Sequence, residues 1–233
     1  MRALVTGGSG FIGGHVVNTL LHKKVDVRVL VRPTTDISTF KELNVEVLTG
    51  DITDPAFLRE AVNGVDLLFH IAADYRFWVP DPQPMYATNV EGTSQILRAA
   101  SEGGVSRIIY TSSVVTVRGS GETPGTEADF MKLEECRSTY QRTKVLAEKA
   151  AWEMIARGMP ITIVNPSTPI GAGDRRPTPT GRLIVDYLTG RLPAFLDTDL
   201  NWVSVEDVAA GHWLAAQKGR VGERYILGHA NLS

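Results

Sequence analysis

The sequence predicts a doubly wound α/β fold, in which helices cover both faces of a parallel sheet. Three observations support this prediction. Short β-rich runs alternate with stretches of helical periodicity, a glycine cluster directly follows the first run, and 43% of the 233 residues are hydrophobic. This alternation is typical of parallel strands joined by crossover helices.

The expected strands are short apolar runs, because strands of a parallel sheet are buried on both faces. Six of them occupy residues 3–6, 25–31, 45–48, 66–72, 107–112 and 161–165. A further strand-like run at residues 224–227 would close the sheet. These seven segments define the expected sheet.

Helical periodicity marks residues 13–21, 55–62, 89–100, 139–157 and 183–189. Asp54 precedes Pro55 as an N-cap residue precedes the first turn of a helix, and Gly103, Gly104 and Gly158 stand where helices end. After residue 166 the alternation of strand-like and helical segments ends, and a Pro/Gly/Arg-rich stretch follows. We therefore expect a nucleotide-binding core at 1–166. Residues 167–233 would form a small, partial substrate subdomain, interleaved with the last strand of the sheet.

Charge and composition exclude several classes of function. The chain has 24 Lys and Arg against 26 Asp and Glu, which leaves no excess of cations for a nucleic-acid backbone. Its single cysteine, Cys136, cannot form an internal disulfide. No apolar run approaches the ~20 residues of a membrane helix, and the N-terminus leaves no room for a signal peptide. We expect a cytoplasmic protein that binds neither membrane nor nucleic acid.

The glycine cluster Gly7-Gly8-Ser9-Gly10-Phe11-Ile12-Gly13 lies between the first strand and the first helix. In this context the backbone N–H groups of the turn hold the pyrophosphate of a dinucleotide. Glycine is required where a Cβ would block the turn, the phosphate or the helix–strand contact. We therefore predict a dinucleotide site; a glycine turn without a ligand is the alternative.

Arg32 stands at the end of the second strand, where NAD-binding proteins usually carry an acidic residue. A guanidinium cannot accept a hydrogen bond from the ribose, but it suits a 2′-phosphate. The residue favours NADP(H), with NAD(H) as the alternative if Asp36 reaches the ribose or Arg32 is only a solvated surface residue.

Tyr140 and Lys144 are four residues apart and share one face of a helix. A tyrosine needs a nearby positive charge to exchange protons near neutral pH, and Lys144 supplies one. Ser113 ends a buried strand at the sheet edge where ligands bind in this fold class. The pattern predicts a catalytic group of Ser113, Tyr140 and Lys144.

This constellation resembles the extended short-chain dehydrogenase/reductase superfamily, in the epimerase/dehydratase and dihydroflavonol-4-reductase-like branch. The resemblance covers nearly the whole chain and rests on residues 6–13, 50–54, 70–73, 88–93, 110–113 and 140–144. Residues 74–78, 165–171 and 177–182 look more closely like the bacterial hopanoid-associated sugar epimerases. Members of this branch usually continue beyond the length of this chain, so we expect the substrate pocket to be incomplete.

The resemblance implies a Rossmann cofactor site and assigns roles position by position. Tyr140 would be the general acid/base, Lys144 would lower its pKa, and Ser113 would hold the substrate oxygen. Pro166 would lie against the nicotinamide, and Asn89 would support the catalytic helix. The full set of expected cofactor-binding residues is Gly7, Gly10, Phe11, Ile12, Gly13, Arg32, Asp51, Ile52, Ala72, Ala73, Asn89, Tyr140, Lys144 and Pro166.

The substrate side is defined by fewer residues. The aromatic group Tyr75, Phe77 and Trp78 follows the fourth strand and would stack on a ring or a sugar face. Arg182, with Arg175 and Arg176, would bind a diphosphate; solvated surface arginines are the equally good alternative.

Three functions remain open. The first is a hydride-transferring oxidoreductase or epimerase that acts on a sugar of hopanoid-type lipid metabolism. The second is an NADPH-dependent carbonyl reductase of the dihydroflavonol-4-reductase type, which the NADP(H) preference favours. The third is a catalytically weak NADP(H)-binding redox sensor, which an incomplete pocket would favour.

The helices expected at 89–100 and 139–157 carry more small and apolar residues than one core-facing stripe requires. The resemblance implies that they form a homodimer interface; deep packing within one monomer is the alternative. No histidine or cysteine has metal-ligand spacing, so no metal is expected, and His70 is interpreted as a satisfied core histidine.

Overall fold

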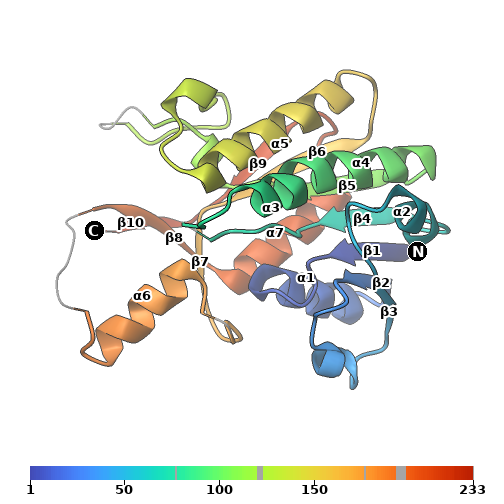
Figure 1. Ribbon diagram of the computed structural model, residues 1–233, viewed down its shortest axis with the longest axis horizontal. Coiled ribbons are helices and arrows are strands. Elements are labelled where there is room, and N and C mark those ends of the chain that lie inside the picture. The colour runs from blue at the N-terminus through green and yellow to red at the C-terminus, as the bar shows by residue number, and fades with distance from the viewer. Residues whose placement is uncertain (77, 120–122, 176, 193–197, 233) are drawn as a thin grey trace.

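The computed structural model describes residues 1–233 except 77, 120–122, 176, 193–197 and 233. Its centre is a sheet of seven strands in the order β3-β2-β1-β4-β5-β6-β9 (Figure 1). Every neighbouring pair in this sheet is parallel. The strands are β1 (Arg2–Thr6), β2 (Asp26–Val31), β3 (Val45–Thr49), β4 (Leu67–His70), β5 (Arg107–Thr111), β6 (Ile161–Pro166) and β9 (Arg224–Leu227).

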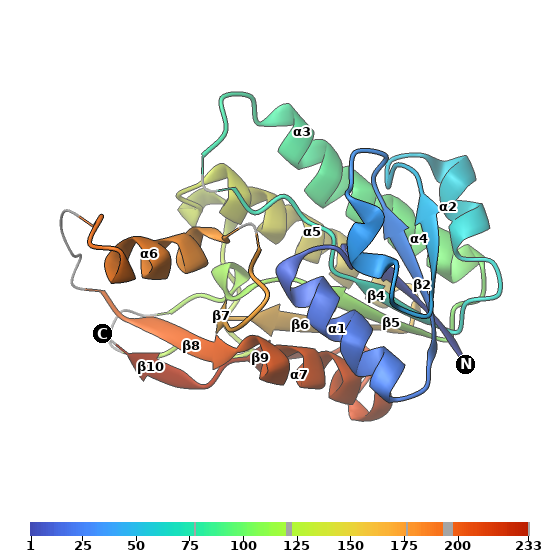
Figure 2. The same cartoon turned by 90° about the horizontal axis from the view of Figure 1, so that it is seen from below.

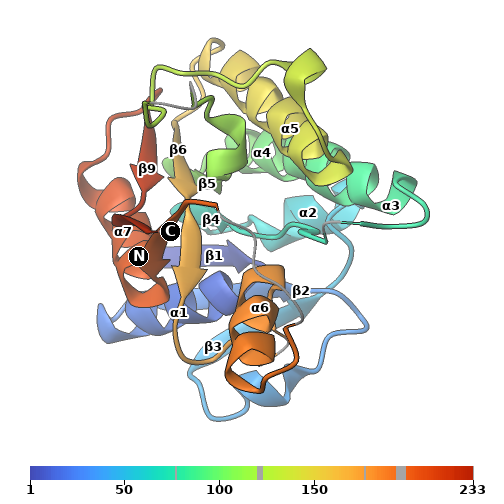
Figure 3. The same cartoon turned by 90° about the vertical axis from the view of Figure 1, so that its left-hand side faces the viewer.

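Helices cover both faces of this sheet, as Figure 3 shows. One face carries α2 (Pro55–Ala61), α4 (Thr93–Glu102) and α5 (Thr139–Ile155), and the other carries α1 (Phe11–His22) and α7 (Val205–Lys218). Each face has its own buried apolar core, with Leu58, Ile96 and Ala147 in the first and Val16 and Ala209 in the second. The predicted doubly wound fold is confirmed.

The strand order turns back at β1, because the chain runs outward from β1 to β3 and then returns to β4 on the other side. Ligands of open α/β sheets bind at the carboxyl ends of the strands beside such a reversal. All seven strands point the same way, so the segments that follow them meet at one edge. This edge is where the predicted site residues lie.

Four of the elements after β6 form a second, smaller layer, visible at the left of Figure 1. It is a three-stranded sheet in the order β10-β8-β7, built from β7 (Thr168–Ile170), β8 (Leu200–Ser204) and β10 (Ala230–Leu232). The helix α6 (Pro179–Leu188) lies beside it (Figure 2). Between these elements the chain returns to the main sheet with α7 and β9. The division at residue 166 stays a prediction.

The structure differs from the expected elements in several places, among them strands β7, β8 and β10, which were not expected. Helix α7 was not expected, although Ser204 caps it by accepting a hydrogen bond from the Asp207 N–H over 3.0 Å. Strand β4 ends at His70: the Ile71 N–H is shared between the Thr6 carbonyl and hydroxyl, and the Ala72 N–H donates to the Thr6 hydroxyl. The helix expected at 89–100 begins as a π-helical segment, Ala87–Gly92, which follows α3 (Gln83–Tyr86) and precedes α4.

Helix α6 exposes apolar side chains, with Leu188 74% and Tyr187 57% exposed. None of its described side chains is buried. Among the residues that the structure describes, no helix combines the length and the apolar character needed to cross a membrane.

Candidate functional site

The turn between β1 and α1 has a shape that only glycine permits. Gly7 has a φ of +74°, and a Cβ there would come within 2.7 Å of the Ala72 nitrogen. A Cβ at Gly13 would overlap the Gly7 carbonyl oxygen. The Gly10 N–H donates to that same oxygen over 2.9 Å, which closes the turn. The backbone of β1, α1 and the segment after β4 is therefore packed without room for side chains.

Helix α1 begins at this turn with its first N–H groups uncapped. Gly10 is the N-cap residue and has no side chain to accept their hydrogen bonds, and the first turn contains no acidic residue. Uncapped N–H groups and the helix dipole favour an anion at this position. Gly7, Gly10, Phe11, Ile12 and Gly13 thus fit the pyrophosphate of a dinucleotide.

The remaining predicted cofactor residues surround the same edge of the sheet. Arg32 follows β2, Ala72 and Ala73 follow β4, and Pro166 ends β6. Asp51 and Ile52 follow β3; the Asp51 carboxylate accepts hydrogen bonds from the Thr53 N–H and hydroxyl over 2.8 and 2.7 Å. These bonds, with a smaller contribution from the Arg32 charge, lower the pKa of Asp51. The sheet thus brings residues from four strand ends around one site.

Arg32 is exposed at this edge. Asp36, the residue that would favour NAD(H), caps the short helix Ile37–Phe40 by accepting a hydrogen bond from the Ser38 N–H over 2.9 Å. Its carboxylate is thus engaged by its own loop in the structure.

Ser113, Tyr140 and Lys144 are brought together by β5 and α5. Ser113 follows β5 and is 9% exposed, and Lys144 is 3% exposed. Burial raises the pKa of the Tyr140 phenol, and a side-chain hydrogen bond from Ser113 lowers it by less. Tyr140 is therefore a neutral phenol that already contacts the Ser113 hydroxyl.

Lys144 is held by strand β5. Its Nζ donates to the Thr111 carbonyl over 2.9 Å and lies 5.0 Å from the centre of the Tyr110 ring. Burial lowers the pKa of Lys144 to about 8, and the Glu148 carboxylate opposes this shift. The side chain therefore carries a positive charge near neutral pH, four residues after Tyr140 on the same helix.

Asn89 connects the catalytic helix to the loop after β4. Its Nδ2 donates to the Asp74 carbonyl over 2.8 Å and to the Thr143 hydroxyl over 3.0 Å, while its Oδ1 accepts from the Asp74 N–H over 2.7 Å. The Thr143 hydroxyl in turn donates to the Tyr140 carbonyl over 2.8 Å. The side chain supports the helix, as the sequence predicts, and its direct contact with a cofactor stays a prediction.

Comparison with known proteins identifies the family. A model of the NAD dependent epimerase/dehydratase family matches residues 3–228. The chain belongs to this epimerase/dehydratase family. The glycine turn and the Ser113, Tyr140 and Lys144 group lie within the matched residues.

Three relatives show the breadth of the epimerase/dehydratase family. A putative dihydroflavonol 4-reductase of Synechocystis sp. is 41% identical over 98% of this chain and 68% of its own length. The crystal structure of gox2253 is 46% identical, with a TM-score of 0.94 over 99% of this chain and 71% of that one. DesIV of Streptomyces venezuelae, a dTDP-glucose 4,6-dehydratase with NAD and TYD bound, is 28% identical, with a TM-score of 0.87 over 100% and 77%. The chain is an NAD(P)-dependent enzyme of the oxidoreductase and epimerase type.

The sequence alone did not predict a buried polar cluster that lies next to the candidate site. Glu148, Arg224, Asn165 and Thr116 are each at most 3% exposed. Their interactions connect α5 to the segment after β5 and to strands β6 and β9. One available clue was Glu148, which follows Lys144 by four residues and so continues the helix face of Tyr140 and Lys144.

His70 is confirmed as a core histidine. It is 1% exposed, and its two ring nitrogens lie 2.8 Å from the Thr6 hydroxyl and 2.9 Å from the Thr93 hydroxyl. Burial, followed by the Lys144 charge, lowers its pKa to about 3. The imidazole is therefore neutral and fully hydrogen-bonded between β1, β4 and α4.

The predicted substrate residues have fewer contacts. Trp78 is 79% exposed and Tyr75 is 41% exposed, while Phe77 lies outside the described residues. Arg182 forms an ion pair with Asp186 over 2.9 Å on the surface of α6, and Arg176 lies outside the described residues. That these residues bind the substrate stays a prediction.

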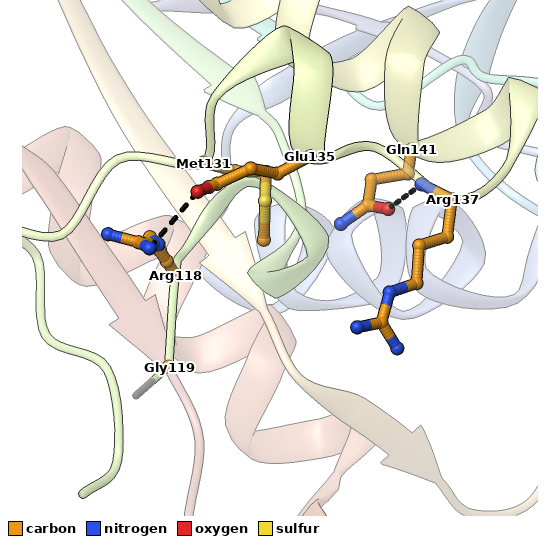
Figure 4. Close-up of a pocket in the computed structure, with 6 residues that line it drawn as sticks. All are labelled: Arg118, Gly119, Met131, Glu135, Arg137 and Gln141. Carbon is orange, nitrogen blue, oxygen red and sulfur yellow. Dashed lines mark hydrogen bonds and ion pairs between the residues drawn. The ribbon is translucent and has the colours of Figure 1, made fainter. Parts of the chain in front are cut away.

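A cavity of about 450 Å³ lies beside the start of α5 (Figure 4). It is lined by Arg118, Gly119, Met131, Glu135, Arg137 and Gln141. Arg118 and Glu135 form an ion pair over 3.0 Å, and Gln141 bonds the Arg137 N–H and the Val115 carbonyl. No ion pair of Arg137 occurs within the described part of the chain. Arg137 makes this cavity, which lies at the start of the helix that carries Tyr140, a candidate anion site.

Proposed function

We propose that this enzyme moves a hydride between a nicotinamide cofactor and the carbinol or carbonyl carbon of a small molecule, with Tyr140 moving the proton. The observation that carries this proposal is the side-chain hydrogen bond between Tyr140, which is partly buried, and Ser113, with a buried and charged Lys144 four residues further along the same helix. The uncapped glycine turn lies at the same sheet edge. A cofactor site and a proton donor thus share one edge of the sheet.

The residue roles follow from these contacts. The Ser113 hydroxyl would hold the substrate oxygen beside the Tyr140 phenol. In reduction, the cofactor supplies the hydride to the carbon, and Tyr140 gives its proton to the oxygen. The phenolate that remains is stabilised by the Lys144 ammonium, because an opposite charge nearby favours the charged form of an acid. In oxidation the same proton moves back to Tyr140.

NADP(H) is the proposed cofactor. Arg32 stands at the end of β2 with its guanidinium exposed, whereas Asp36 caps its own loop. A guanidinium binds a phosphate through charge-assisted hydrogen bonds and offers a ribose hydroxyl no acceptor. These facts support NADP(H) over NAD(H).

The proposed enzyme type is a carbonyl reductase. A reductase releases its cofactor after each turnover, and the proposed cofactor NADPH suits an enzyme that exchanges its cofactor in this way. The 41% identity to a putative dihydroflavonol 4-reductase supports it. The second candidate is an epimerase of a nucleotide sugar, including a sugar of hopanoid-type lipids, which the likeness to NAD-bound DesIV favours. Nucleotide retained through purification would favour the epimerase, and an empty site that binds NADPH reversibly would favour the reductase.

The test replaces the proton donor. Tyr140→Phe should lower the turnover of NADPH with a reactive aldehyde such as 4-nitrobenzaldehyde by about 10²-fold or more, since acid–base catalysis typically contributes 10²–10⁴-fold. NADPH binding, measured by fluorescence titration, should be unchanged. The matched control is Tyr187→Phe on α6, where the phenol is 57% exposed. Equal turnover of wild type and Tyr140→Phe would refute the catalytic assignment of Tyr140, and absence of turnover in both would leave the redox sensor as the better function.

We also propose that the enzyme is a homodimer that pairs α4 and α5 with their copies. Ala147, Ala151 and Met154 of α5 are buried within the chain, but Trp152 and Ile155 remain partly exposed beside them. Light scattering on a size-exclusion column should give twice the chain mass at micromolar concentration. A monomer mass there would contradict the proposal.

A further inference from the structure

Glu148 is a buried carboxylate on the catalytic helix. It is 3% exposed and follows Tyr140 and Lys144 at intervals of four residues on α5. Residues four apart share a face of a helix, so all three side chains extend from one side of α5. A buried carboxylate is costly unless it is paired and hydrogen-bonded. Its partners therefore indicate what it does.

The counter-charge comes from the last strand of the main sheet. Arg224 of β9 is 3% exposed, and its Nη1 lies 2.8 Å from Glu148 Oε1. The other guanidinium nitrogens donate to the Glu127 carbonyl over 2.7 Å and to the Asp129 carbonyl over 2.9 Å, and the Phe130 ring packs 3.9 Å from the guanidinium carbon. The ion pair thus joins α5, β9 and the segment before α5, and both of its side chains are buried from solvent.

The second carboxylate oxygen of Glu148 is bonded to two residues that contact the Ser113 carbonyl. It lies 2.6 Å from the Thr116 hydroxyl and 3.0 Å from Asn165 Nδ2. Asn165 Nδ2 also donates to the Ser113 carbonyl over 3.0 Å, and the Thr116 hydroxyl lies 2.8 Å from the same carbonyl. Thr116 has one hydroxyl proton, which the carboxylate attracts more strongly than a carbonyl does. Asn165 therefore carries the link from Glu148 to the backbone of Ser113.

Glu148 also acts on Lys144. The groups that face Lys144 are Tyr110 and the Thr111 carbonyl from β5, His70 from β4, and Tyr140 and Glu148 from its own helix. His212 of α7 is bonded to the Thr111 hydroxyl and is neutral, because burial lowers its pKa to about 4. Glu148 is the carboxylate that raises the pKa of Lys144 against the effect of burial.

We propose that Glu148, held by Arg224, is the positioning residue of this site: it fixes the backbone of Ser113 through Asn165 and places a compensating negative charge beside Lys144. The inference rests on the proposed function, because it assigns Ser113 and Lys144 their roles beside Tyr140. Glu148 touches neither substrate nor cofactor in it. Its effect reaches Tyr140 from two sides, through the serine and through the lysine.

The first test is the pH profile of Glu148→Gln, with NADPH and 4-nitrobenzaldehyde as the probe. The amide keeps the shape and a hydrogen-bond acceptor but removes the charge. The decline of kcat at high pH should begin about one pH unit lower than in wild type, since a nearby opposite charge typically shifts a pKa by about one unit or more. The KM for NADPH should not change. The control is Glu153→Gln, the same substitution at an exposed position of the same helix.

A second variant controls for the possibility that Glu148→Gln acts only by disturbing the fold. Glu148→Gln leaves Arg224 buried without its partner, so the double variant Glu148→Gln/Arg224→Gln removes both charges and retains hydrogen-bonding groups. Its kcat profile should move in the same direction as that of the single variant. A purely structural role would lower activity equally at every pH. A profile of either folded variant that overlaps the wild-type profile would overturn the proposal.

A readout without turnover separates the inference from the proposed function. Protein labelled with ¹³C at lysine Cε allows the titration of Lys144 to be followed by NMR, with Lys144→Arg for assignment. The midpoint should fall by about one pH unit in Glu148→Gln. If the wild type reduces no aldehyde, the proposed function fails, and this titration still decides whether Glu148 acts on Lys144. An unchanged midpoint would reject that action.

Discussion

Asn89 and Thr143 are joined by a hydrogen bond of 3.0 Å between the π-helical segment and α5. Asn89 is 1% exposed and bonds the backbone of Asp74 in both directions, while Thr143 bonds the Tyr140 carbonyl. The helix that carries Tyr140 and Lys144 is thereby attached to the segment after β4. That segment also provides Ala72, which lies against the glycine turn.

Asn89→Ala should destabilise the fold and lower activity. It leaves the Asp74 N–H, the Asp74 carbonyl and the Thr143 hydroxyl without this partner, and each unpaired buried group costs about 1–3 kcal/mol. We expect the free energy of unfolding, measured with urea, to fall by about 3 kcal/mol. Gln95→Ala is the control, because Gln95 Oε1 is buried without a partner in the described structure. A loss no greater than that of the control would contradict the assigned role.

Arg32→Ala should weaken NADPH binding by about 10- to 100-fold, since a charge-assisted hydrogen bond contributes about 1.5–3 kcal/mol. NADH has no 2′-phosphate, so its affinity should be unchanged. Fluorescence titration of both nucleotides measures the difference. Arg59→Ala, an exposed arginine on α2, serves as the control. Equal weakening of both nucleotides would show that Arg32 does not select the cofactor.

Two buried histidines should make the fold sensitive to acid. The pKa values of His70 and His212 are lowered by burial to about 3 and about 4. In the unfolded chain these side chains bind protons below about pH 6.5, whereas in the fold they stay neutral to a lower pH. Protons therefore favour the unfolded chain, and stability falls as the pH drops from about 6.5 towards 4. Each histidine contributes a slope of about 1.4 kcal/mol per pH unit.

Urea unfolding at pH 7, 6 and 5 measures this slope. The double variant His70→Gln/His212→Gln should be less stable at pH 7 but should lose less stability on acidification than wild type. The substitution His22→Gln, at an exposed position of α1, should leave the slope unchanged. Parallel pH curves for wild type and the double variant would count against the assignment.

Arg137 should select substrates by charge. It lines the cavity beside α5, where Arg118 is neutralised by Glu135. When the anion 4-formylbenzoate is the substrate, Arg137→Ala should weaken its apparent affinity by about 10-fold, because one charge-assisted bond contributes about 1.5 kcal/mol or more. Steady-state kinetics should show this loss as a higher KM, with no change for the uncharged methyl ester. Arg157→Ala, near the far end of α5, is the control, and equal changes for acid and ester would exclude the cavity as an anion site.

The expected strands and the glycine turn were predictable because their causes are local. Alternating periodicity, the context of Gly7 to Gly13 and the spacing of Tyr140 and Lys144 depend on residues close together in the chain. Helix α7 was missed because its sequence follows an irregular stretch; its cap, Ser204, and its acidic first turn were the available signals. The end of β4 was misplaced because the side chain of Thr6, a distant residue, accepts the hydrogen bond of the Ala72 N–H and shares that of the Ile71 N–H with its own carbonyl.

By itself the sequence determined the doubly wound fold, the glycine turn after the first strand and the spacing that puts Tyr140 and Lys144 on one helix. Only the tertiary structure decided how that helix is supported. Glu148 meets Arg224 across 76 positions of the chain, and Asn89 meets Thr143 across 54. Local patterns record which helices and strands form, because side-chain periodicity has to match backbone geometry. Contacts between distant residues leave no such period, because they arise only when the sheet places its helices and last strand side by side.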